Sequence, residues 1–377
     1  MTTTRSGEPE QVLPGVPLTI ARLAELAGVS VPTVSKVVNG HAQVAPETRA
    51  RVEALINQHG FRRQKRASAP SSHVELVFHE LEGAYAMELI RGAEQVASKH
   101  GMAVALSHLH GEQTPGRGWI EVVLTRRPAA VVTVFCGLTE VQHEQFRSRG
   151  IEVVVLDPAG DPGHPTHSVG AGNWNGGLTA TRHLLDLGHR RIAAITGPHR
   201  VLSSRARLDG HRAAMDAAAA PFDPDLVCEG DFHTADGLEF GRQLLCLPDP
   251  PSAIVTGNDL QALGVYQAAS EVGLRIPRDL SVVGFDDLPL AQWASPPLTT
   301  IRQPLTEMAA AATAMAITLS RGQEPQQERI EFATRLVVRA STAAPRDQSA
   351  GHTKAWKPQQ ARQPSVKSEH TSADAML

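Results

Sequence analysis

Hydrophobic positions follow two different patterns along the chain. Between residues 18 and 60, apolar residues recur every three or four positions, which predicts three short amphipathic helices. From Val74 to Asp287, short runs rich in Val, Ile and Ala alternate with longer amphipathic stretches. Such an alternation is typical of parallel sheets that helices cover on both faces. The sequence therefore predicts a small helical head followed by two doubly wound α/β units that face each other across a cleft.

Composition sets the expected boundaries. Both ends are rich in Pro, Ser, Gln and charge with few periodic apolar residues, and ASAPSSH before Val74 resembles a linker. The predicted division is a disordered segment 1–17, a helix-turn-helix head 18–63, a linker 64–73, a first lobe formed by 74–161 and about 302–328, a second lobe formed by 162–301 and about 329–343, and a disordered tail 344–377.

The head carries clear helix signals. Thr19 is placed to cap the first helix, and Gly28 allows a tight turn after it. Ser30 then caps the second helix, and Pro32 stands where a backbone N–H has no partner within the helix. Because Pro32 lacks that N–H, Ser30 must accept from the N–H of Thr33.

Two short helices joined by a glycine turn, with a third running from Pro46 to Gly60, form a helix-turn-helix. In this motif the second helix lies in the major groove of DNA, with its first residues on base edges. A small helical bundle without DNA is the alternative. Charge favours DNA: the whole chain has a net charge of −3, but residues 18–66 hold eight Lys and Arg against three Glu.

The text LAELAGVSVPTVSKVVNG…VAPETRARVEALINQHGF closely resembles the DNA-binding head of the lactose-repressor (LacI/GalR) family, and the likeness continues to about Ser341. The resemblance implies a periplasmic-binding-protein-like core, a homodimer on a two-fold-symmetric operator, and a carbohydrate effector that releases it. Effector binding would reorient the lobes and so change operator affinity. A sugar-responsive activator remains an open alternative.

The resemblance also indicates how DNA would be contacted. Val31 and Pro32 offer only apolar contact, which suits a thymine methyl group, whereas Lys36 can donate to guanine as a point charge. The linker RRQKRASAPSSH has no leucine to wedge into the minor groove, so its basic residues are expected on phosphates or in the minor groove. The predicted DNA contacts are Ser30, Val31, Pro32, Thr33, Ser35, Lys36, Asn39, Arg62, Arg63, Lys65 and Arg66.

Polar residues follow several predicted strands, where ligands of such sheets bind. The resemblance implies an effector site made by Tyr85, Asp157, Arg207, Phe232, Asn258 and Asp286. Arg and carboxylate side chains can hold adjacent hydroxyls, and an aromatic ring can cover a sugar. Asp259 and Asp287 are expected to be caps or loop hydrogen-bonding groups, and Phe232 could equally be a core residue.

Other functional classes have weaker support. GAGNWNG, from Gly170 to Gly176, misses the dinucleotide fingerprint by one position, and neither a P-loop nor HExxH is present, which argues against a nucleotide-dependent enzyme. No metal or cofactor is expected, and three separated cysteines suggest reduced thiols. The longest nearly uncharged helical run, about 308–319, is too short for a membrane span, and no export signal is evident, so we expect a cytoplasmic protein associated with the nucleoid when bound to DNA. A free sugar-binding protein is disfavoured by the missing export signal and by the head.

Overall fold

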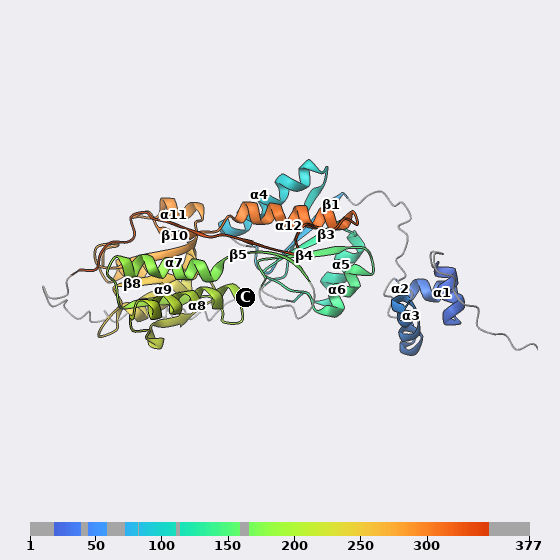
Figure 1. Cartoon of the computed structure of the whole chain (residues 1–377), viewed down its shortest axis with the longest axis horizontal. Coiled ribbons are helices and arrows are strands. Elements are labelled where there is room, and N and C mark those ends of the chain that lie inside the picture. The colour runs from blue at the N-terminus through green and yellow to red at the C-terminus, as the bar shows by residue number, and fades with distance from the viewer. Residues whose placement is uncertain are drawn as a thin grey trace, which may run out of the picture.

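The computed structural model describes residues 19–38, 44–58, 72–81, 83–110, 114–158 and 166–346. The head contains α1 (Ile20–Ala27), α2 (Val31–Val38) and α3 (Pro46–Gln58) (Figure 1). One fully buried side chain from each helix, Leu23, Val34 and Val52, meets in a common core. The predicted three-helix head is therefore confirmed.

The predicted helix signals are present in the head. Thr19 Oγ1 accepts the Arg22 N–H at 3.2 Å, and Gly28 ends α1 in the left-handed region with φ +65°. Ser30 Oγ accepts the Thr33 N–H at 3.3 Å, as the position of the proline requires. The predicted ends of the second and third helices, Asn39 and Gly60, lie outside the described residues.

Lobe 1 is a six-stranded parallel sheet with helices on both faces (Figure 1). Its strands are, in sheet order, β11 (Arg329–Phe332), β5 (His167–Ala171), β4 (Glu152–Leu156), β3 (Ala130–Val134), β1 (His73–Phe78) and β2 (Ala103–His108). α4 (Gly83–Lys99) and α12 (Leu305–Ser320) pack on one face, and α5 (Arg117–Arg126) and α6 (Glu140–Arg147) pack on the other.

Lobe 2 repeats this architecture. Its strands are, in sheet order, β12 (Arg335–Val337), β10 (Thr299–Arg302), β9 (Ser281–Asp286), β8 (Ala253–Thr256), β6 (Ile192–Thr196) and β7 (Val227–Glu229), and β12 is antiparallel to its neighbour. Its helices are α7 (Asn173–Asp186), α8 (Leu202–Ala217), α9 (Thr234–Leu245), α10 (Asp259–Glu271) and the short α11 (Pro289–Trp293), with a 3₁₀ turn at Pro224–Leu226. No helix among the described residues is both long and apolar enough to cross a bilayer.

In the part of the chain that the structure describes, the crossings between the lobes are three: after β5, between β10 and α12, and between β11 and β12. The sequence-based division assigned 162–301 and 329–343 wholly to lobe 2, which differs from the sheets. β5 pairs with β4, and Val169 at its centre is fully buried in the lobe 1 core. β11 pairs with β5 and therefore also belongs to lobe 1. The first and third crossings thus lie several residues later than expected.

Candidate functional site

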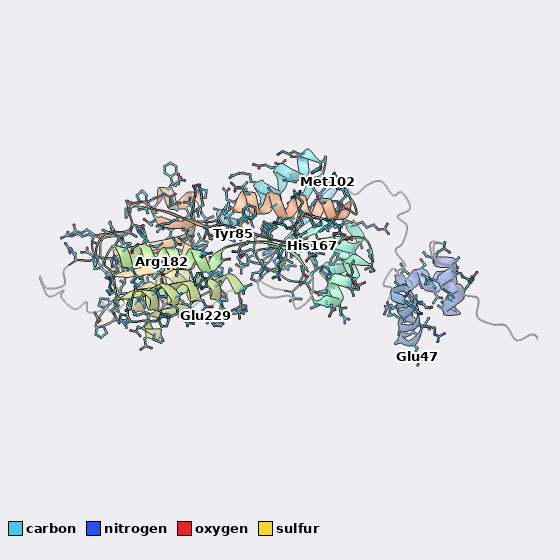
Figure 2. All side chains as sticks on the ribbon, viewed as in Figure 1. Glu47, Tyr85, Met102, His167, Arg182 and Glu229 are labelled. Carbon is cyan, nitrogen blue, oxygen red and sulfur yellow. The ribbon has the colours of Figure 1, made fainter. Side chains whose placement is uncertain are left out.

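Six residues that the sequence analysis assigned to an effector site come from both lobes. Tyr85 lies in the first turn of α4, and its hydroxyl donates to Asp157 Oδ2 at 3.1 Å. Figure 2 shows Tyr85 where the two lobes meet. The Tyr85 ring also contacts Phe135, with centroids 5.5 Å apart. Lobe 1 therefore presents one phenol and one carboxylate at this junction.

Arg207 is the central cation of the site. It extends from α8, and only 8% of it is exposed. Its Nε donates to Asn173 Oδ1 at 2.8 Å, and its Nη1 donates to the carbonyl oxygen of Gly257. Nη1 also lies 3.9 Å from Asp286 Oδ1, and the guanidinium sits 3.7 Å from the centroid of the Phe285 ring. These contacts fix the plane and direction of the guanidinium before any ligand binds.

Close helix packing brings Arg207 to this position. A Cβ on Gly177 of α7 would lie 2.0 Å from the Arg207 carbonyl oxygen, and one on Gly210 of α8 would lie 2.1 Å from the Trp174 carbonyl oxygen. Both distances are far below van der Waals contact. The two glycines therefore allow α7 and α8 to approach backbone to backbone, and this sets the depth at which Arg207 enters the site.

Burial dominates the electrostatics of the two site carboxylates. It raises the pKa of Asp286 to about 7, although Arg207 and a hydrogen bond from Gln303 act in the opposite direction. Burial likewise raises the pKa of Asp157 against the effects of Arg207 and Tyr85, and it raises the pKa of Tyr85 itself. The site thus holds one guanidinium and two carboxyl groups whose charge is costly without a polar ligand.

Three residues of the site at or just after strand ends have a strained backbone. Asp157 has φ +52°, Asp286 has φ +107°, and Phe232 has φ +67°. Such values disfavour non-glycine residues by about 1–3 kcal/mol each and concentrate at functional sites. The strain sets the direction in which each of the three side chains leaves the backbone at the junction.

The other two predicted contacts are already engaged within lobe 2. Asn258 caps α10, since its Oδ1 accepts the Gln261 N–H at 2.9 Å, and its Nδ2 donates to the Phe232 carbonyl oxygen at 2.8 Å. The Phe232 ring is half-buried, and its centroid lies 5.9 Å from the Arg207 guanidinium carbon. Asn258 and Phe232 thus support one another beside Arg207, and their contact with a ligand remains a prediction.

Two neighbouring aspartates have the structural roles that were expected. Asp259 is fully buried and accepts from the Leu288 N–H at 2.8 Å and from the Thr300 hydroxyl at 2.6 Å. Asp287 forms ion pairs with Arg302 at 3.0 Å and with Arg339. Asp259 therefore joins the start of α10 to β10 and to the turn after β9, whereas Asp287 joins the end of β9 to β10 and to the segment after β12.

Sequence reasoning missed three residues of the site. Asn173 holds Arg207, Phe285 supports the guanidinium from its ring face, and Gln303 Nε2 donates to Asp286 Oδ1 at 2.6 Å. The available signal was position, since Asn173 and Gln303 are polar residues just after strand ends at two of the lobe crossings. The GAGNWNG stretch contains Asn173, and its Gly176 makes room for Phe285, because a Cβ there would lie 2.6 Å from that ring.

One further pair joins the lobes near the site. His233 Nε2 of lobe 2 lies 3.9 Å from Glu80 Oε2 of lobe 1, and both side chains are more than 40% exposed. His233 directly follows Phe232, so this contact lies beside the aromatic residue of the site. An exposed pair of this kind contributes at most about 1 kcal/mol, and it is screened by salt.

A separate cavity of about 240 Å³ lies in lobe 2 between α8 and β7, with Arg205, Arg212 and Glu229 among its lining residues. Arg212 already stacks on Phe222 at 5.1 Å and pairs with Asp209 at 3.5 Å. None of the predicted site residues lines it.

Within the described residues there is no group of three or more His, Cys, Asp or Glu that is placed to hold a metal ion.

The head presents a second candidate surface. Val34 and Val37 of α2 are buried, whereas Val31, Pro32 and Lys36 are exposed. This orientation leaves the first turn of α2 open for contact with base edges, as the helix-turn-helix geometry requires. The predicted contacts Asn39, Arg62, Arg63, Lys65 and Arg66 lie outside the described residues.

A helix-turn-helix head joined to a two-lobed α/β domain defines the class of ligand-controlled DNA-binding regulators. Two family models match the chain: "Bacterial regulatory proteins, lacI family" over residues 19–64, and "Periplasmic binding protein-like domain" over residues 181–342. The ribose operon repressor of Escherichia coli (strain K12) is 33% identical over 331 residues, covering 86% of this chain and 99% of the relative. The chain belongs to the LacI family, and it is a ligand-responsive, DNA-binding transcriptional repressor.

Solved structures agree with this assignment. The transcriptional regulator CelR in complex with cellobiose superposes with a TM-score of 0.65 at 29% identity, covering 86% of this chain and 99% of that one. The lac repressor dimer bound to operator and the anti-inducer ONPF superposes with a TM-score of 0.64 at 28% identity, covering 87% of this chain and 100% of that one. The family and the fold predicted from the sequence are therefore confirmed.

Proposed function

We propose that this repressor controls carbohydrate-utilisation genes as a homodimer on a two-fold-symmetric operator, and that a neutral sugar releases it. The relatives described above include proteins whose names or structures involve ribose, cellobiose and the lac operator. Because its partner is chromosomal DNA, we expect the protein to act in the cytoplasm, without enzymatic activity.

The charged groups around Arg207 favour a neutral sugar as the effector. Arg207 is held between Asn173 and the Gly257 carbonyl, with the carboxyl groups of Asp157 and Asp286 nearby. Guanidinium and carboxyl groups together can donate to and accept from adjacent hydroxyls. A sugar phosphate would bring a charge of about −2 toward two buried carboxyl groups and a single guanidinium. The charge balance therefore favours a polyhydroxyl ligand without a phosphate.

The proposed mechanism is a shift between two lobe arrangements. Tyr85 and Asp157 approach the ligand from lobe 1, whereas Arg207 and Asp286 approach it from lobe 2. A ligand that contacts both sets stabilises one relative orientation of the lobes, and it can shift the equilibrium only by its difference in affinity for the two arrangements. In a dimer, that change alters the spacing of the two heads and so the operator affinity.

The experiment compares Arg207→Ala with Arg182→Ala, a matched change at an exposed arginine of α7. Operator binding is measured by fluorescence anisotropy with and without the sugar that releases the unmodified protein. We expect Arg207→Ala to bind operator normally and to lose the response to sugar, whereas Arg182→Ala keeps both. An Arg207→Ala protein that responds at the same sugar concentration would contradict the proposed site.

A further inference from the structure

The cavity between α8 and β7 in lobe 2 is separate from the proposed effector site, and its volume is about 240 Å³. α8 forms one wall, and the edge strand β7 with the 3₁₀ turn before it forms the opposite wall. Arg205, Arg212 and Glu229 line it and are exposed, so the cavity is open to water. Sites for drug-sized ligands begin at about 300 Å³, so this cavity suits a smaller molecule.

Arg205 brings a cation to the cavity from the α8 wall. Its guanidinium makes no hydrogen bond or ion pair with any residue that the structure describes. Arg212, about two turns further along α8, is engaged instead. Asp209 Oδ1 lies 3.5 Å from its Nη1, and the centroid of the Phe222 ring lies 5.1 Å from its guanidinium carbon. Arg205 therefore supplies the unpaired N–H donors of the cavity.

Glu229, at the end of β7, brings a carboxylate to the opposite wall (Figure 2). Its Oε1 accepts the His199 N–H at 2.6 Å, and its Oε2 has no partner among the described residues. Arg205 and Glu229 do not form an ion pair with each other, although both line the same cavity. The cavity thus holds an unpaired guanidinium and a half-engaged carboxylate on different walls.

Charged residues around the cavity do not change this balance. Arg200 pairs with Asp231 at 3.8 Å, and Arg191 pairs with Asp223 at 3.0 Å. Asp225 follows the turn residue Pro224 but does not line the cavity. The lining therefore offers a ligand one free positive group and one free negative group.

We propose that this cavity binds a small zwitterion, an α-amino acid, as a second ligand of the repressor. A carboxylate accepts two parallel N–H bonds from a guanidinium, and an ammonium group donates to a carboxylate. Leu208 and Val227 line the same cavity and offer apolar contact to the side chain of such a ligand. A ligand with charge of only one sign would satisfy Arg205 or Glu229 but not both.

The proposed amino-acid site shares a helix with the proposed effector site. Arg207, the central cation of that site, is two positions after Arg205 on α8. Residues two apart on a helix point to different sides, so the two ligands would lie on different sides of α8. Amino-acid binding would therefore bear on the helix that positions Arg207, although the proposal does not depend on sugar binding.

The test is isothermal calorimetry of the full-length protein with each standard amino acid, up to millimolar concentration. The amino acid that binds is then titrated into Arg205→Gln and into Glu229→Gln. The matched controls, Arg182→Gln on α7 and Glu239→Gln on α9, change exposed side chains that do not line the cavity. Circular dichroism checks that every variant is folded.

We expect each cavity variant to weaken binding about tenfold or more, because each removes one charge-assisted hydrogen bond. Both controls should bind as the unmodified protein does. The corresponding carboxylic acid without the amino group should bind the unmodified protein about tenfold or more weakly, because it leaves Glu229 without a donor.

Arg207→Ala separates this proposal from the effector site, since Arg207 does not line the cavity. It should retain amino-acid binding even where its response to sugar is lost. Binding that Arg207→Ala abolishes and Arg205→Gln leaves unchanged would place the amino acid between the lobes and overturn the proposal. The absence of binding by every amino acid would also overturn it, as would equal affinity for the amino acid and for the acid without its amino group.

Discussion

Gln303 donates a hydrogen bond of 2.6 Å to Asp286, and this bond ties an acid of the proposed effector site to a crossing between the lobes. Gln303 lies between β10 of lobe 2 and α12 of lobe 1, and it is 3% exposed. In the proposed mechanism, any change in the charge or position of Asp286 would therefore act directly on a segment that bends when the lobes rotate. This hydrogen bond would connect ligand binding to the hinge.

Effector binding should depend on pH near neutrality. The pKa of Asp286 is about 7 in the folded protein, well above its ordinary value, so this group gains a proton as pH falls from 8 to 6. The ionised form accepts sugar hydroxyls and balances the charge of Arg207. The affinity for sugar should therefore decrease as the pH is lowered, by up to about tenfold for each pH unit below the pKa. Isothermal calorimetry at several pH values measures this affinity.

The control for this prediction is a pair of Asp→Asn variants. Asp286→Asn should bind sugar weakly and lose the transition near pH 7, whereas Asp216→Asn, on the exposed side of α8, should retain it. A sugar affinity that stays constant between pH 8 and pH 6 in the unmodified protein would contradict the assignment of Asp286.

Removing the amide of Gln303 should move this transition upward. The hydrogen bond from Gln303 favours the ionised form of Asp286, so Gln303→Leu raises the pKa of that carboxyl above about 7. The midpoint of the pH profile for sugar binding should therefore shift to higher pH. Gln323→Leu, at an exposed position after α12, serves as the control, and a midpoint common to both variants would refute the role given to Gln303.

Close packing of α7 on α8 gives a prediction about stability. Gly177→Ala places a methyl group 2.0 Å from the Arg207 carbonyl, so the helices must separate, at a cost of about 1–3 kcal/mol in unfolding free energy. Arg207 moves with α8, and sugar affinity should fall as well. Gly118→Ala on α5 meets no atom within 4 Å and should be neutral or stabilising by up to about 1 kcal/mol. Urea denaturation compares the two variants, and equal stabilities would contradict this account.

The fold was largely predictable from hydrophobic periodicity, because Val-rich strands such as β3 and β4 are buried on both faces and leave a continuous apolar signal. The boundaries between the lobes were harder to predict from the sequence. β5 (HSVGA) is short and glycine-containing, and its partner β11 lies more than 150 residues away in sequence, so only tertiary pairing assigns both strands to lobe 1.

The site was predictable only in part. Asp157, Arg207 and Asp286 follow from the family resemblance, and the structure places their charges close together. The roles of Asn173 and Gln303 arise because the lobe crossings place the amide of Asn173 beside Arg207 and the amide of Gln303 beside Asp286. Local sequence does not encode that proximity, because each contact joins residues from different elements.

The recognition helix has two predicted contributions. Ser30→Ala removes the cap of α2 and should lower the stability of the head by about 1 kcal/mol, with a parallel loss of operator affinity. Lys36→Ala should weaken specific binding by about 1–3 kcal/mol while leaving the head as stable as before, because this side chain is exposed. Thermal unfolding and operator binding, measured on the same samples, separate the two effects. A Lys36→Ala protein with unchanged operator affinity would exclude this lysine from base recognition.

The most direct test of the central claim is footprinting of the full-length protein on DNA that flanks its own gene, repeated with neutral monosaccharides and disaccharides and with their phosphorylated forms. We predict a protected, two-fold-symmetric site that one neutral sugar abolishes and that its phosphate ester leaves intact. Protection that resists every neutral sugar but is lost with a sugar phosphate would contradict the proposed effector.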